Sequence, residues 1–165
     1  MKRLTPFFAA ALALGACATS AQTPAKKPAP SDMAKHHAPH VLTQKSAADF
    51  DATLAQLRRA IDTRGFKTFA VIDHAAGAAS VDASLRPTTL VIFGAPKGGT
   101  LVMQAKQAMG LELPLKMLVT QGEDGVVTLT WRDMGHTFHE YGIADHPVAE
   151  KMSEALKAIA EEAGR

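Results

Sequence analysis

Histidines form the most obvious groups of residues in this chain that can do chemistry. Three lie within five positions of one another before residue 41, and two lie three positions apart near the C-terminal end. Neutral imidazole is a common ligand of zinc, copper and nickel. The spacing does not match the His-Glu-x-x-His helix of zinc peptidases, so surface polar residues stay open as the alternative. The candidate metal ligands are His36, His37, His40, His136 and His139.

A glycine-rich segment gives a second candidate site. Residues 94–100 read Gly-Ala-Pro-Lys-Gly-Gly-Thr and are expected to join a buried strand to a helix. Free backbone N–H groups at a helix start favour an anion such as phosphate or carboxylate. A tight structural turn is the alternative, and the residue order does not match a P-loop. With two cations and a histidine at a strand end added, the hypothetical ligand site comprises His74, Arg86, Gly94, Lys97, Gly98 and Thr100.

Motifs for covalent catalysis are missing from the sequence. It has one cysteine, no Gly-x-Ser-x-Gly elbow, no Cys-x-x-Cys pair and no convincing pair of carboxylates. We therefore assign no catalytic residue and no cofactor, and a non-enzymatic role is favoured. A small enzyme with a cleft near His74, Arg86 and Lys97 is the alternative.

The N-terminal segment predicts the compartment. Two cationic residues precede an apolar run from Leu4 to Leu14, which is well short of the ~20 residues that span a bilayer. The run ends in Leu-Gly-Ala-Cys, which resembles the bacterial lipobox and predicts lipidation of Cys17. Residues 1–16 are then a lipoprotein signal peptide, and the protein is expected at the outer membrane, facing the periplasm. A soluble periplasmic protein is the alternative.

Charge is distributed unevenly along the 165 residues. The whole chain has a formal net charge of +2, yet residues 46–165 contain 12 basic and 15 acidic residues. The excess of lysines lies in residues 17–39 and shortly after them, a Pro-, Ala- and Lys-rich stretch that is typical of a flexible tether. The remaining single domain, residues 40–165, is therefore acidic, which argues against nucleic-acid binding.

Hydrophobic periodicity predicts the elements of this domain. Apolar residues recur at helical spacing from Phe50 to Ile61, where Ser46 to Asp49 resemble a capping box and Gly65 a helix stop. A second amphipathic helix is predicted over 147–163, with Asp145 as its cap, and a short helix over 100–109. Residues 75–83 form a short helix or a loop. Strands are predicted over 41–44, 68–74, 88–93, 116–121 and 126–132, the last two as a hairpin.

Three separated strings resemble the domain-of-unknown-function family 302. They are Phe69–His74, Arg86–Thr100 and Leu113–Val119, and they occur in the order and spacing typical of that family. The resemblance implies an α+β fold of TATA-binding-protein-like β-α-β4-α architecture, with a curved, mainly antiparallel sheet and helices packed on one face. It also implies a homodimer, and no established activity. The family often has Asn where this chain has Ala95.

Together these features predict an envelope-anchored module that binds a small ligand or another protein. Its expected partners are the membrane, through Cys17, a second copy of the chain and an unidentified small ligand. Periplasmic binding of copper or zinc through histidines is the alternative function.

Overall fold

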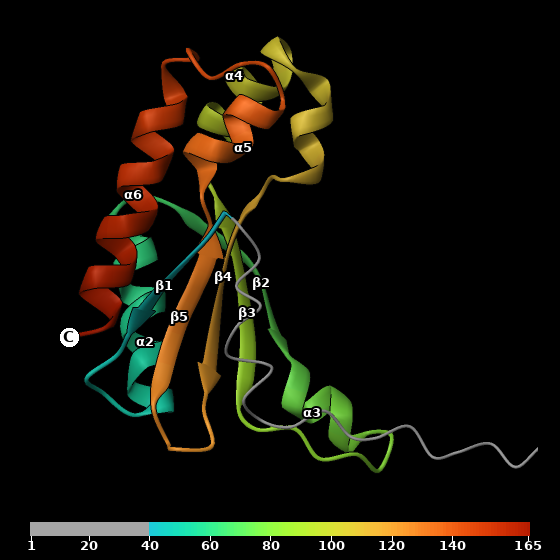
Figure 1. The fold of residues 1–165 in the computed structure, drawn as a ribbon, viewed down its shortest axis with the longest axis vertical. Coiled ribbons are helices and arrows are strands. Elements are labelled where there is room, and N and C mark those ends of the chain that lie inside the picture. The colour runs from blue at the N-terminus through green and yellow to red at the C-terminus, as the bar shows by residue number, and fades with distance from the viewer. Residues whose placement is uncertain (1–39) are drawn as a thin grey trace, which may run out of the picture. The chain divides into compact units, whose positions relative to one another are not determined.

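The computed structural model describes residues 40–165 (Figure 1). The predicted signal peptide, the tether, Cys17, His36 and His37 lie outside these residues. The described residues form one compact unit. Its elements are β1 (Val41–Lys45), α2 (Phe50–Thr63), β2 (Lys67–Asp73), α3 (His74–Ala79), β3 (Thr88–Gly94), α4 (Pro96–Ala105), the 3-10 helix η1 (Gln107–Leu111), β4 (Leu115–Gln121), β5 (Val127–Arg132), α5 (Met134–Glu140) and α6 (Val148–Ala163).

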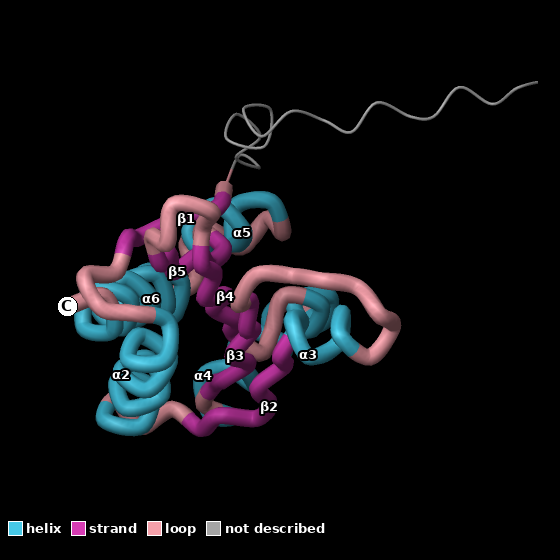
Figure 2. Tube along the Cα trace, turned by 90° about the horizontal axis from the view of Figure 1, so that it is seen from below, coloured by secondary structure: helices cyan, strands magenta, loops and turns pink. Residues whose placement is uncertain are grey.

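The five strands form one sheet in the order β1-β5-β4-β3-β2. All four pairings are antiparallel. The predicted α+β class and mainly antiparallel sheet are therefore confirmed, and β3 is an interior strand as its apolar sequence indicates. The first and last helices of the family pattern, α2 and α6, lie side by side on one face of the sheet, whereas α3 lies on the other side (Figure 2).

Side-chain alternation along the strands divides the sheet into a buried and a partly exposed face. In β5, Val127, Leu129 and Trp131 are buried and the residues between them are half-buried. The same alternation in β3 and β4 extends the buried face, which α2 and α6 cover. The core therefore lies between this face and the two long helices.

The ends of the long helices differ in detail from the sequence expectations. Asp49, not Ser46, caps α2, because its side chain accepts from the backbone N–H of Ala52 at 2.8 Å. The predicted stop is confirmed, since Gly65 adopts a positive φ of 75°. Asp145 does not cap α6; the helix follows Pro147 and has no side-chain cap.

The short helices differ more from the sequence expectations than the long ones. Residues 74–79 are helical, which settles the choice left open for residues 75–83 and makes His74 the first residue of α3, not the end of a strand. Asp73 is the cap of that helix. The helix predicted over 100–109 in fact begins at Pro96, so the glycines at 98 and 99 are helical residues and not a linking loop. Among the described residues, no helix is both long and apolar enough to cross a membrane.

The fold predicts which substitution is costly. Phe93 is fully buried in β3, so Phe93→Ala should lower the free energy of unfolding by about 3–5 kcal/mol through lost burial and a residual cavity. Val81 is 71% exposed, and Val81→Ala should stay within about 0.5 kcal/mol of wild type. Urea unfolding of both variants measures this difference, and equal losses would contradict the assigned core.

Candidate functional site

The main cavity lies at the end of the sheet where β3 ends and β4 begins. Its volume is about 540 Å³, which is within the usual range for small-molecule sites. Segments from β2, α4, the start of β4 and the first turns of α6 form its wall. Most lining side chains are apolar, and Lys151 is the one charged residue among them. The large apolar side chains of the wall include Phe66, Phe69, Met103, Leu113, Val148 and Met152.

Glycines keep this cavity open. A Cβ at Gly98 would lie 4.0 Å from the Met152 methyl group, and one at Gly99 would lie 3.8 Å from Leu113, so larger side chains there would project into the space between α4 and its neighbours. At Gly94 a Cβ would lie only 3.2 Å from the Phe69 ring. The glycine therefore lets this ring, itself 47% exposed, pack over the end of β3 as part of the wall.

The structure brings together three of the six residues predicted for a ligand site. Gly94, Gly98 and Thr100 line the cavity. Lys97 lies in the first turn of α4 and is exposed, and it is not part of the wall. The anion-binding loop expected here is thus the start of a helix that borders an apolar cavity.

His74 and Arg86 do not belong to this group. Gly94 pairs with Lys67 at one end of the β2–β3 ladder, whereas Asp73, the neighbour of His74, pairs with Thr89 at the other end. The Arg86 guanidinium forms an ion pair with Glu123 at 2.8 Å and donates to the carbonyl of Gln121. The predicted cluster of His74, Arg86 and Lys97 is therefore wrong, because His74 and Arg86 lie at one end of the β2–β3 ladder and Lys97 follows the other end.

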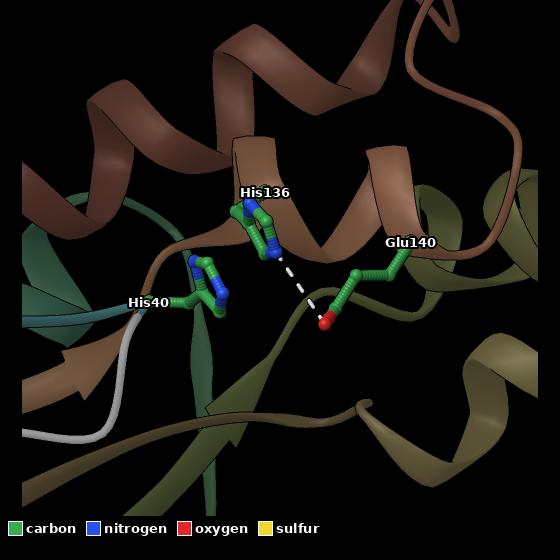
Figure 3. A group of neighbouring side chains, drawn as sticks. All are labelled: His40, His136 and Glu140. Atoms are coloured by element: carbon green, nitrogen blue, oxygen red, sulfur yellow. Dashed lines mark ion pairs between the residues drawn. The ribbon is translucent and has the colours of Figure 1, made fainter.

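A second group of polar residues gathers around α5 (Figure 3). The rings of His40 and His136 stack with centroids 3.1 Å apart and planes 1° apart. His136 Nε2 lies 3.4 Å from Glu140 Oε1. Potential ligand atoms of these three residues all lie within 4.8 Å of one another. His139, exposed on the same helix, is not part of this group, and its ring centroid is 6.2 Å from that of His136.

Backbone contacts fix the position of His40 beside α5. Val41 pairs with Arg132 in the β1–β5 ladder, and the carbonyl of His40 accepts from the backbone N–H of Asp133 at 2.9 Å. His40 adopts a φ of 90°, an uncommon conformation for a residue with a side chain. Asp133 also caps α5, since its carboxylate accepts from the N–H of His136. Asp133 thus forms hydrogen bonds with both histidines: its backbone N–H donates to His40, and its carboxylate accepts from His136.

Arg132 links Glu140 to a second carboxylate. Its Nη2 lies 3.4 Å from Glu140 Oε2, and its Nε lies 3.9 Å from Glu112 Oε2. The Tyr141 hydroxyl donates to Glu112 at 3.3 Å. These contacts form a chain from Tyr141 through Glu112, Arg132 and Glu140 to His136. The Arg132 side chain at its centre is 38% exposed.

Two groups in this region have a shifted pKa. Burial lowers the pKa of the Lys116 ammonium, partly offset by the nearby Glu112 carboxylate, and Lys116 donates to the carbonyl of Glu112. Desolvation raises the pKa of the Tyr141 phenol, and the negative charge of Glu112 adds to this effect. Both shifts disfavour the charged form of the group.

Sequence reasoning identified His40 and His136 but missed Glu140. The missing signal was the spacing of His136 and Glu140, which are four positions apart and share one face of a helix. Because the segment 132–141 has no clear apolar period, no helix was predicted there. The apolar cavity was also missed, since its wall comes from segments far apart in the sequence.

Comparison with known proteins identifies the family. The sequence model described as "Domain of unknown function DUF302" matches residues 42–160, most of the chain. The chain belongs to this family. A solved DUF302 protein, the uncharacterized conserved protein from Bacillus stearothermophilus, has the same fold, with a TM-score of 0.69 and 15% identity. The match covers 78% of this chain and 100% of that protein.

Among curated proteins, fluoride-specific ion channels from Brucella share part of this sequence. Channel FluC 1 of Brucella suis biovar 1 (strain 1330) is 36% identical over 93 residues, and FluC 2 of Brucella melitensis biotype 1 (strain ATCC 23456 / CCUG 17765 / NCTC 10094 / 16M) matches equally. The matched region is 56% of this chain but only 37% and 34% of those proteins. This DUF302 chain thus spans about a third of the length of these relatives.

The cap of α5 gives a direct test of this arrangement. Asp133→Ala should lower the free energy of unfolding by about 1 kcal/mol, because the N–H of His136 loses its acceptor. Asp133→Asn keeps an acceptor oxygen and should retain most of the stability. Urea unfolding of the two variants checks this, and an Asp133→Asn protein as unstable as Asp133→Ala would contradict the capping role.

Proposed function

We propose that this DUF302 domain binds a small molecule with an apolar chain in the cavity between α4, α6 and the sheet. The observation that carries the proposal is a cavity of about 540 Å³ whose lining side chains are apolar except for Thr100 and Lys151. Soluble proteins seldom leave large apolar side chains exposed together without a binding role. Here Phe69 and Met103, both in the wall, are 47% and 37% exposed.

The wall composition indicates the chemistry of the ligand. Each methylene buried against it contributes about 0.8 kcal/mol, so affinity should rise with chain length until the cavity is filled. Lys151, exposed on α6 and part of the lining, supplies a positive charge for an acidic head group. A linear or lightly branched carboxylic acid with an apolar chain combines both features.

No residue of the wall supplies a nucleophile with an activating base. Thr100 is the one hydroxyl residue of the lining, and neither a histidine nor a carboxylate lines the cavity with it. General acid–base or nucleophilic catalysis needs such a group within hydrogen-bond reach. Binding or carriage of the ligand is therefore favoured over its chemical conversion.

Filling the cavity should abolish binding. Octanoate and decanoate should bind the wild-type protein, and Gly98→Leu should weaken this at least tenfold because its side chain occupies the space before Met152. Gly77→Leu, a matched change at a helical glycine with no atom within 4 Å and outside the wall, should bind like wild type. Isothermal titration calorimetry gives both affinities.

Comparing octanoate with octanol tests the role of the carboxylate. Octanol has the same chain without the carboxylate, so octanol binding equal to octanoate binding would assign the affinity to the wall alone and exclude a role for Lys151. The proposed function would be overturned by the absence of binding across chain lengths from six to twelve carbons, or by an unchanged affinity in Gly98→Leu.

We further propose that the chain is held at the bacterial envelope through a lipid on Cys17, with soluble periplasmic location as the alternative. The Leu-Gly-Ala-Cys string after a cationic start and an apolar run supports this. In cells expressing the full chain, labelled fatty acid should be incorporated and the protein should sediment with membranes. Cys17→Ser should lose the label and leave the membrane fraction, and a labelled or membrane-bound Cys17→Ser protein would contradict lipidation at this residue.

A further inference from the structure

We propose that His40, His136 and Glu140 bind a divalent transition-metal ion, with Zn²⁺ as the best match. The site is separate from the apolar cavity, because none of its residues lines that cavity. Its validity therefore does not depend on the proposed function.

The donor set fits an ion of this class. Two imidazole nitrogens and one carboxylate oxygen are ligands that zinc sites use, and three protein ligands leave a position for water. In a tetrahedral site with bonds of about 2.0–2.1 Å, ligand atoms are about 3.3 Å apart. His136 Nε2 and Glu140 Oε1 lie 3.4 Å apart already, and no pair of ligand atoms in the group exceeds 4.8 Å.

The two histidine rings must change their relative orientation to complete the site. The rings of His40 and His136 are parallel, so their lone pairs lie in separate planes and one ring must tilt to meet a shared ion. Both residues are half-buried, which leaves space for this rotation. Figure 3 shows that the two rings and the Glu140 carboxylate converge from the start of β1 and from one face of α5.

Neighbouring charges favour a cation at this position. Arg132 contacts Glu140 Oε2 and leaves Oε1 directed toward His136, the arrangement in which an outer residue orients a metal-binding carboxylate. Glu112 offsets the Arg132 charge at 3.9 Å. With neutral imidazoles, the two carboxylates and one guanidinium sum to one negative charge, which offsets half the charge of a divalent ion.

Backbone geometry places His40 specifically for this contact. His40 is one of two non-glycine residues with positive φ among residues 40–165. Its carbonyl is held by the N–H of Asp133, the residue that caps α5. An uncommon backbone conformation retained beside a cluster of ligand groups is typical of a binding site.

The test uses the full chain with Cys17→Ser, His36→Ala and His37→Ala, so that the thiol and the other imidazole ligands before residue 40 are removed. Titration with Zn²⁺ in a calorimeter should give one ion per chain. Co²⁺ should give the intense visible absorption of a four-coordinate ion. In the same background, His136→Ala and Glu140→Gln should each weaken Zn²⁺ binding at least tenfold and reduce the Co²⁺ absorption.

His139→Ala is the matched control, because His139 is exposed on α5 and lies outside the group. It should bind Zn²⁺ like its parent. Glu140→Gln replaces one carboxylate oxygen by an amide nitrogen on an exposed side chain, and circular dichroism verifies that the variant folds. The absence of stoichiometric binding, binding unchanged in His136→Ala and Glu140→Gln, or an equal loss in His139→Ala would overturn the proposal.

Discussion

Burial of one face of the sheet beneath α2 and α6 is the constraint on which the rest of the structure depends. The alternating side chains of β3, β4 and β5 pack against these helices and form the continuous core. Once that face is fixed, strand register sets every other position. The same register sends Arg132 to the opposite face from Trp131 and places it beside Glu112 and Glu140.

Both candidate sites arise where this packing ends. The cavity forms at the end of the sheet, where α4 and the first turns of α6 meet the β3 and β4 termini without large side chains at residues 98 and 99. The polar group forms where β1 begins and β5 passes into α5. The cavity wall shares Leu115 and Met152 with the core, whereas Gly98 and Glu140 lie outside it, so substitutions at these two positions can be separated from loss of folding.

Sequence periodicity was sufficient for the long elements and insufficient for the short ones. The stripe from Phe50 to Ile61 and the alternation in β5 follow directly from burial of one face, and both elements are where the pattern places them. α5 has seven residues, too few to show a period, so the pairing of His136 with Glu140 was not visible. The His74–Arg86–Lys97 group failed because Arg86 precedes β3 and Lys97 follows it, so the full length of that strand separates the two cations.

The α4 N-terminus shows how this chain differs from the pattern that its family resemblance implies. Ala95 is the residue before the helix, has no side-chain hydrogen bond to it, and lines the cavity. Asn, which the family resemblance implies at this position, is among the best helix-capping residues, and its replacement by Ala costs about 1 kcal/mol. In exchange, the wall gains a methyl group in place of a polar amide. The uncapped helix start therefore presents a methyl group to the cavity, which agrees with the apolar wall on which the proposed function rests.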